Sequence, residues 1–336
     1  MSRSSTTGTP AFSIIVPSRN RPHYLAECLD AIAAQTCNDY EVLVIDDGSD
    51  EESRSAYESL IGGYGRERFR HVIHNPAGAG GAGPSLVRNI GLRIARGEYI
   101  AFCDDDDHWC RDDHLEIALA SLRKTGADLY LSNQQAVAPG GEVIIETLME
   151  NVARKAAENT AVLEDVFPVS VGDVLSYPDY AHLNITILER RLAERLSGFW
   201  ERTNYAEDVH FFVRASELAR GILYRNRTCA IHNVPARRKK ADSVSTRLEQ
   251  LDKHMLETMV YQHLLCVVRH PAAIRYGRLS LSNMQKTIAS ELEADGRHSA
   301  AALFAANALS TLPGVKWALK TALVSVKALS SGLRPG

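Results

Sequence analysis

The chain has 336 residues, 45% of them hydrophobic and 24% charged, which is the composition of a globular protein with a core large enough for two structural units. Its formal net charge of −3 gives no support to wholesale binding of nucleic acid. The 6 cysteines include no CxxC pair, so we expect reduced thiols, no zinc site and a cytoplasmic location.

Strand and helix patterns alternate from residue 12 onward, after a Ser/Thr-rich start that lacks the apolar segment of a signal peptide. Apolar runs predict strands at 12–17, 40–49 with its closing turn, 69–74 and 99–103, and helices from Pro22, over 53–60 and over 85–95. No apolar run is long enough to span a bilayer. Such alternation predicts an α/β protein with a parallel sheet covered by helices, which binds ligands beyond the carboxyl ends of its strands.

Four consecutive carboxylates, Asp104 to Asp107, follow the predicted strand at 99–103. Their mutual repulsion favours protonation of some of them unless a cation lies among them. Mg²⁺ and Mn²⁺ prefer oxygen ligands and often share them with substrate phosphates, so we interpret the run as a metal–diphosphate site. A solvated acidic loop is the alternative. Asp46 and Asp47 end another predicted strand of the same sheet, which favours the first interpretation.

The next segments carry fewer signals. The glycine-rich loop 78–84 has neither the GxGxxG nor the Gly-Lys-Ser/Thr pattern of nucleotide-binding loops, so it either lets the backbone approach a ligand or is a mobile connection. Strands are predicted at 129–132 and 184–188, and helices over 144–157, 189–196 and 210–218. Glu207 and Asp208 precede the last of these helices. They could cap its N-terminus, or Asp208 could act as a general base.

Six segments, taken in order, resemble a known family. They are residues 16–21, 35–42, 44–49, 88–92, 97–107 and the pair 207–208. Together they resemble family-2 glycosyltransferases of the GT-A fold over roughly residues 12–235. The resemblance implies a mostly parallel, Rossmann-like sheet flanked by helices. We expect a disordered stretch over 1–10, a GT-A domain over 11–245 and a helical C-terminal region over 246–336. Within the domain, 11–110 is the expected nucleotide-binding half and 111–245 the acceptor half.

The resemblance also implies how the donor nucleotide is held. Asp47 is expected to accept a hydrogen bond from the base of a nucleoside diphosphate, most often uracil, with Pro17 and Arg19 beside the base or ribose. Asp104 and Asp106 match the two carboxylates of the DxD signature. Asp106 is then the more direct ligand of a divalent cation, Mn²⁺ or Mg²⁺.

Three points of this assignment stay open. Four consecutive aspartates leave the register undecided, so Asp105 could take either DxD role. His232 resembles a late histidine that completes the metal or diphosphate site, or it is structural. The basic segment 237–240 could clamp diphosphate, attract a phospholipid or be a solvated loop. Asp208 matches the family's usual catalytic base.

The implied activity is an inverting, metal-dependent transfer of a hexosyl or N-acetylhexosaminyl unit. The donor is a nucleotide sugar, expected to be a UDP-sugar, and the acceptor is a hydroxyl of a glycan or lipid-linked glycan in bacterial-type surface polysaccharide or glycoconjugate synthesis at the cell envelope. One alternative is a non-catalytic nucleotide-sugar-binding relative. Another is a sugar-phosphate nucleotidyltransferase, against which the glycine-free loop 17–22 argues.

The C-terminal region has a helical pattern over 251–268, 281–292, 299–309 and 315–329. The last segment places Lys316 and Lys320 on one face and carries Trp317. A basic amphipathic helix of this kind can lie on the inner face of an anionic membrane, pack on its own domain or form a homo-oligomer.

Overall fold

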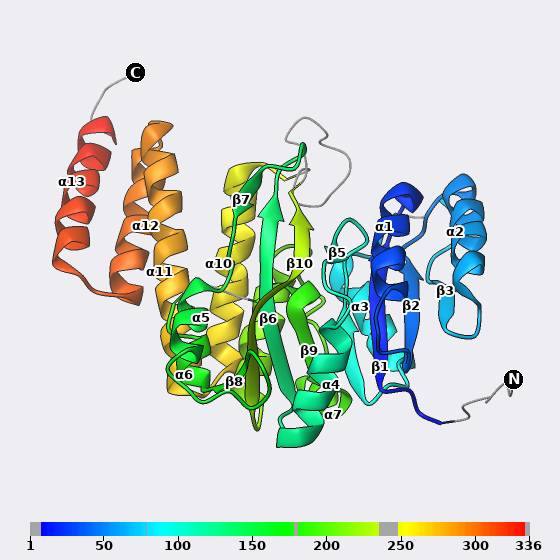
Figure 1. Cartoon of the computed structure of the whole chain (residues 1–336). Coiled ribbons are helices and arrows are strands. Elements are labelled where there is room, and N and C mark those ends of the chain that lie inside the picture. Colours follow the sequence, from blue (N-terminus) through cyan, green and yellow to red (C-terminus); the bar gives the residue numbers. More distant parts are fainter. Residues whose placement is uncertain (1–7, 79, 178–180, 235–247, 333–336) are drawn as a thin grey trace, which may run out of the picture. The chain divides into compact units, whose positions relative to one another are not determined.

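The computed structural model describes residues 8–78, 80–177, 181–234 and 248–332 (Figure 1). The chain divides into two compact units, one made of residues 1–174 and 179–236 and the other of 175–178 and 237–336. The predicted boundary at residue 245, the basic segment 237–240 and most of the predicted disordered N-terminus lie outside the described residues.

The first unit is built around a sheet that has ten strands among the described residues, in the order β3-β2-β1-β4-β9-β6-β10-β5, with β7 beside β6 and β8 beside β10. The strands are β1 (Phe12–Ser18), β2 (Tyr40–Asp46), β3 (Phe69–Ile73), β4 (Tyr99–Phe102), β5 (His108–Trp109), β6 (Leu129–Val137), β7 (Val143–Ile145), β8 (Val166–Val169), β9 (Thr186–Glu189) and β10 (Ile222–Asn233). Neighbours from β3 to β4 are parallel, as are β6 and β10, whereas β9 runs antiparallel between β4 and β6.

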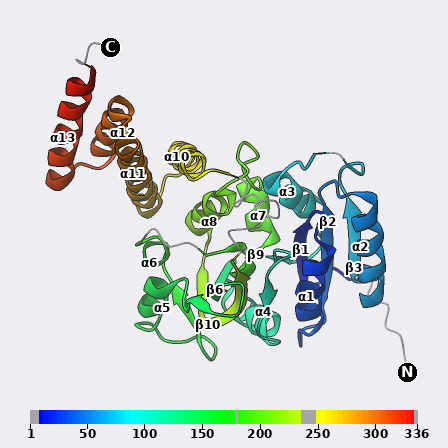
Figure 2. The same cartoon turned by 90° about the horizontal axis from the view of Figure 1, so that it is seen from above.

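Helices cover both faces of this sheet, as Figure 2 shows for α1 and α4 on one face and α3, α7 and α8 on the other. The helices are α1 (Pro22–Ala33), α2 (Glu51–Tyr64), α3 (Pro84–Ile94), α4 (His114–Thr125), α5 (Glu150–Ala156), α6 (Val171–Val174), α7 (Arg190–Leu196) and α8 (Glu207–Leu218), with a 3₁₀ turn, η1, at Leu183–Ile185. Every residue of β2 is buried, as expected for a strand covered on both faces. The predicted α/β fold is confirmed.

The prediction of one helix over 144–157 is wrong in its first part. Val143–Ile145 forms β7, which pairs antiparallel with β6, and α5 begins only at Glu150. The turn between β6 and β7 contains Gly140 and Gly141 with φ values of 126° and 88°, a conformation that glycine adopts without steric cost. This turn returns the β-branched residues to the sheet, where they pair instead of starting a helix.

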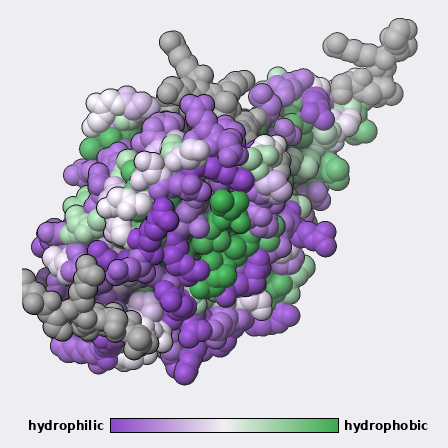
Figure 3. All heavy atoms as spheres, turned by 90° about the vertical axis from the view of Figure 1, so that its right-hand side faces the viewer, coloured by the Kyte–Doolittle hydropathy of each residue, from purple (hydrophilic) through white to green (hydrophobic). Residues whose placement is uncertain are grey.

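The surface on the side of β3 and α2 is mostly hydrophilic, with one compact hydrophobic patch (Figure 3). β3 is an edge strand of the sheet, and its last residue, Ile73, is 48% exposed. Arg70 and His71 lie beside it in the same strand. Charged or polar side chains on an edge strand discourage pairing with another chain.

The second unit is helical, as predicted, and consists of α10 (Gln250–Val267), α11 (Pro271–Ala294), α12 (His298–Thr311) and α13 (Val315–Gly332). Consecutive helices pack against each other around Ile288, Leu292, Ala301 and Val324. Among the described residues, no helix combines the length and apolar character needed to cross a membrane.

Candidate active site

The acidic residues at the end of β2 are held by backbone N–H groups and, in the case of Asp46, also by Nε of Arg54 at 3.2 Å. Asp46 is fully buried, and its Oδ1 accepts a hydrogen bond of 2.8 Å from the N–H of Ser49. Burial alone would raise the pKa of Asp46, but its interactions with His71 and Ser49 hold that pKa below its usual value. The Asp47 carboxylate accepts hydrogen bonds from the N–H groups of Ala82 (2.8 Å) and Gly83 (3.1 Å). Asp47, the expected base-binding residue, therefore holds the glycine-rich loop.

At position 81 the glycine-rich loop passes close to the side chains of Arg19 and Asp47. A Cβ on Gly81 would lie 2.6 Å from Nη1 of Arg19 and 2.7 Å from Oδ2 of Asp47. The loop backbone thus approaches the two residues expected at the nucleotide, which favours the close-approach interpretation of its glycines. Pro17, the third of these residues, is half-buried in β1, where it pairs with Ile45 of β2.

The carboxylates that follow β4 have side-chain cations as partners. Arg21, at the start of α1, forms ion pairs with Asp105 and, at 2.8 Å, with Asp106. Asp105 is fully buried and also accepts a 2.5 Å hydrogen bond from Oγ of Ser18. Burial raises the pKa of Asp105 to about 7, although Arg21 opposes the shift. The side chain of Asp106 is 24% exposed, so it is the more open of the two carboxylates.

Asp107 and two histidines form a group that could hold a metal ion. Oδ2 of Asp107 lies 2.9 Å from Nδ1 of His232, and Oδ1 accepts a 2.8 Å hydrogen bond from the N–H of Asn233. One ligand atom each from Asp107, His182 and His232 lies within 4.8 Å of the others, and this is the one such group among the described residues. Burial would lower the pKa of His232, but the Asp107 carboxylate raises it to about 9. Without a cation, the pair is thus an ion pair.

The residues present fit a divalent cation. A carboxylate and two imidazoles converge at the group, and Asp106 lies one residue from Asp107. Carboxylate oxygens and imidazole nitrogens are ligands that Mn²⁺ accepts. The expected ligand His232 belongs to this group. The expected ligand Asp106 instead faces Arg21, so its role as a ligand stays a prediction.

Arg88 of α3 links Asp104 to the start of α8. Its Nη2 lies 2.7 Å from Oδ1 of Asp104 and its Nη1 lies 2.8 Å from Oε1 of Glu207. Burial alone would raise the pKa of Asp104, but Arg88 lowers it to about 2. Asp208 follows in the first turn of α8, is half-buried, and accepts a 2.8 Å hydrogen bond from the N–H of Val209. The sequence predicted that the acidic pair precedes a helix over 210–218, but the helix begins at Glu207, so the pair lies in its first turn.

Sequence reasoning assigned no role to Arg21, Arg88, His182 or Asn184. Arg21 and Arg88 lie in segments that carry the family resemblance, but nothing local shows which carboxylates they meet. His182 gave no signal in the sequence. Asn184 donates a 2.5 Å hydrogen bond to Asp107 and accepts one of 2.8 Å from the N–H of Asp104.

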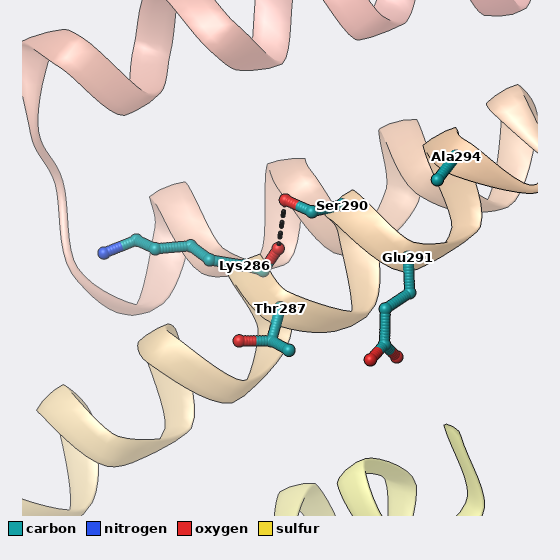
Figure 4. Close-up of a pocket in the computed structure, with 5 residues that line it drawn as sticks. All are labelled: Lys286, Thr287, Ser290, Glu291 and Ala294. Atoms are coloured by element: carbon teal, nitrogen blue, oxygen red, sulfur yellow. Dashed lines mark hydrogen bonds between the residues drawn. The ribbon is translucent and has the colours of Figure 1, made fainter. Parts of the chain in front are cut away.

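Two surface hollows lie apart from these carboxylates. One runs along α11 and is lined by Lys286, Thr287, Ser290, Glu291 and Ala294; Figure 4 shows Lys286 and Glu291 extending away from each other. The other, of about 470 Å³, lies in the first unit between α3 and α7. Neither hollow contains Asp104–Asp107, Asp208 or His232. We place the candidate site at the carboxylates because the possible metal ligands gather there.

Comparison with known proteins shows a similarity to one family over part of the chain. Residues 13–167 match the model of glycosyl transferase family 2. The succinoglycan biosynthesis protein ExoW of Rhizobium meliloti strain 1021 is 30% identical over 210 residues, which cover 60% of this chain and 61% of ExoW. The chain spans 35%, 27% and 21% of the length of three further curated glycosyltransferases that it matches.

Solved structures share the fold. Residues 1–349 of S. aureus TarS in complex with UDP-GlcNAc superpose with a TM-score of 0.65 at 18% identity, covering 90% of this chain and 81% of that one. The mannosyltransferase PcManGT of Pyrobaculum calidifontis, in complex with GDP-Man and Mn²⁺, gives 0.55 at 20% identity, covering 97% and 87%. Over residues 13–167 the chain is thus similar to glycosyl transferase family 2.

Proposed function

We propose that this chain transfers a sugar from a nucleotide sugar to a hydroxyl of a glycan or lipid-linked glycan, with inversion at the anomeric carbon and with the help of Mn²⁺ or Mg²⁺. The observation that carries the proposal is the gathering of carboxylates from two distant segments around one arginine. Arg88 contacts both Asp104 after β4 and Glu207 in α8, next to Asp208. We assign the transferase to residues 11–245.

Donor binding is assigned to the ends of β1 and β2. Asp47 offers its carboxylate to the N–H group of a base, and a base bound there takes the place of the N–H groups of Ala82 and Gly83. Pro17 and Arg19 border the same position. The likeness to a structure that contains UDP-GlcNAc supports a UDP-sugar as donor, of the hexosyl or N-acetylhexosaminyl kind.

The diphosphate is assigned to the carboxylates after β4. A divalent cation bound there would neutralise the charge that develops on the leaving diphosphate. Asp106, Asp107, His182 and His232 are the residues that would hold it, with Asp104 and Asp105 supporting them. Arg21 forms ion pairs with Asp105 and Asp106. When a cation binds these carboxylates, Arg21 could contact a phosphate of the donor in their place. The likeness to a structure that contains GDP-Man and Mn²⁺ supports this assignment.

Asp208 is assigned the role of general base. It removes the proton of the acceptor hydroxyl while that oxygen attacks the anomeric carbon from the face opposite the diphosphate. One displacement inverts the configuration and needs no carboxylate nucleophile. Asp208 suits the role because it is half-buried, whereas the neighbouring Glu207 is engaged by Arg88.

The acceptor is assigned from the relatives. The similarity to ExoW, a succinoglycan biosynthesis protein, supports a role in surface polysaccharide synthesis on the cytoplasmic side of the cell membrane.

α13 exposes Val315 (82%) and Leu319 (70%), which suits weak peripheral membrane contact. However, Lys320 and Lys327 of the same helix pair with Glu293. Co-sedimentation with anionic vesicles, with and without residues 313–336, tests this contact, and equal sedimentation of both forms would refute it.

The experiment that tests the function is a panel of UDP-, GDP- and dTDP-sugars incubated with the protein and Mn²⁺. We expect release of nucleoside diphosphate from one sugar class, accelerated by Mn²⁺ and abolished by EDTA. A non-catalytic relative would bind nucleotide sugars without any release. A nucleotidyltransferase would instead form a nucleotide sugar from a nucleoside triphosphate and a sugar phosphate. NMR of the transfer product then reports inversion or retention.

A further inference from the structure

Arg88 occupies an unusual position because it contacts three segments of the chain at once. It lies in α3, is 5% exposed, and its two terminal nitrogens bind carboxylates from the loop after β4 and from the first turn of α8. The guanidinium carbon also lies 5.7 Å from the centre of the Phe199 ring, in the loop that leads to α8.

The chemistry of these contacts requires a guanidinium. The side chains of Asp104 and Glu207 are 18% and 11% exposed, and a carboxylate this buried needs a partner charge to stay ionised. Burial raises the pKa of Glu207, and Arg88 opposes that shift. The planar fork of an arginine can reach two carboxylates in fixed directions, whereas a lysine offers one compact charge.

Other contacts already attach α3 to the loop before α8. Nδ2 of Asn89 donates a 3.0 Å hydrogen bond to the carbonyl of Phe199, and Oγ of Ser85 donates one of 3.1 Å to the carbonyl of Thr203. A Cβ on Gly198 would lie 2.3 Å from Oδ1 of Asn89, so the loop packs tightly on this helix. The packing of α3 on the loop therefore does not depend on Arg88 alone.

We propose that Arg88 is a positioning residue that fixes the distance between the acidic run after β4 and the first turn of α8, and so places Asp208 opposite the bound diphosphate. This role rests on the function proposed above. Arg88 acts through Asp104 and Glu207 and need not touch the substrate. Misplacing a catalytic group by about 1 Å can cost about 10²-fold in rate, so a residue that sets this distance controls turnover.

The test compares Arg88→Lys, Glu207→Gln and their double variant with the wild type. Ser85→Ala is the matched control, because Ser85 lies in the same helix and contacts the same loop but neither acidic segment. For each protein we would measure the melting temperature, the Kd for UDP with Mn²⁺, and kcat and KM for hydrolysis of the donor found in the panel. Donor hydrolysis needs no knowledge of the acceptor.

We expect Arg88→Lys and Glu207→Gln each to lower kcat about 10- to 100-fold, with the Kd for UDP changed by less than about 3-fold. The double variant should be little worse than the poorer single variant, because both changes break one linkage. Ser85→Ala should keep the wild-type kcat. If Arg88→Lys does not fold, Glu207→Gln alone carries the comparison.

Three results would overturn the proposal: an unchanged kcat in folded variants, a loss of UDP affinity as large as the loss of kcat, or effects that add fully in the double variant. The second result would make Arg88 a nucleotide-binding residue. A wild-type protein that releases no nucleoside diphosphate from any donor would instead refute the proposed function, and this role with it.

Discussion

Two acidic segments lie at the carboxyl ends of strands in the same sheet, yet they have different partners. After β2, backbone N–H groups of residues 82 and 83 bind Asp47, whereas Asp46 accepts hydrogen bonds from the N–H of Ser49 and from Nε of Arg54. After β4, the partners of Asp104 to Asp107 are mainly side-chain cations, namely Arg21, Arg88 and His232. A backbone donor is fixed by the fold, whereas a side chain can move when a competing cation arrives. The first segment is suited to a neutral base and the second to a metal and a diphosphate.

The largest expected effect comes from Asp208, which we propose as the general base beside the carboxylates after β4. Asp208→Asn keeps the size of the side chain but removes its basicity, so we expect kcat to fall by about 10²- to 10⁴-fold. The Kd for UDP with Mn²⁺ should stay near the wild-type value. Steady-state kinetics and calorimetric titration measure the two quantities. Undiminished turnover would rule out Asp208 as the base.

The contrast between the two segments is sharpest in the metal dependence of nucleotide binding. We expect Asp106→Ala to abolish the increase in UDP affinity that Mn²⁺ gives, because its carboxylate belongs to the proposed metal site. Asp47→Ala should weaken UDP binding about 10-fold to the same degree with and without Mn²⁺, since it removes a hydrogen bond to the base. If both variants lost the increase in UDP affinity that Mn²⁺ gives, the assignment of the base to Asp47 and of the metal to Asp106 would be wrong.

Asp46 lies next to Asp47, but we expect it to affect the stability of the protein and not the binding of UDP. Asp46→Asn should lower the free energy of unfolding by about 1–3 kcal/mol, because it weakens buried contacts with Ser49 and Arg54. Urea denaturation measures this change. The increase in UDP affinity with Mn²⁺ should persist in the variant, and its disappearance would show that Asp46 belongs to the metal site.

The smallest expected effect is a pH dependence of stability that arises outside both segments. His114 of α4 is fully buried beside Trp109 and Tyr130, and burial lowers its pKa to about 3. The unfolded chain binds a proton at this residue below about pH 6.5 while the folded protein does not, so stability falls as pH decreases from 6.5 toward 3. His114→Phe should flatten the part of this slope seen in urea midpoints between pH 6.5 and 4.5. An unchanged slope would contradict the assignment.

The strands next to the site could be predicted because their signal is local. The segments that become β1, β2 and β4 are mostly apolar and almost entirely buried, and the glycines, prolines and acidic turns around them mark their ends. The family resemblance and the helical pattern after Asp208 placed it just before a helix, and it lies in the first turn of α8. β7 was missed because a three-residue strand is decided by its pairing with β6, which lies outside the local sequence.

The partners of the carboxylates could not be predicted. Arg21 and Arg88 reach Asp104 to Asp106 only because α1 and α3 pack on the sheet at particular angles, and no local pattern encodes those angles. His182 joins Asp107 and His232 from a segment without regular structure. The sequence therefore indicates which residues carry charge at the site, whereas the tertiary packing decides which charges remain available to a ligand.

The most direct test of the central claim is the position of the cation itself. Crystals grown with UDP and Mn²⁺ would locate the ion by its anomalous scattering. The account predicts one peak bound by the carboxylates after β4 and by His232, in contact with the diphosphate and on the same side of the sheet as Asp208. A nucleotide bound without this peak, or a peak bound elsewhere, would contradict it.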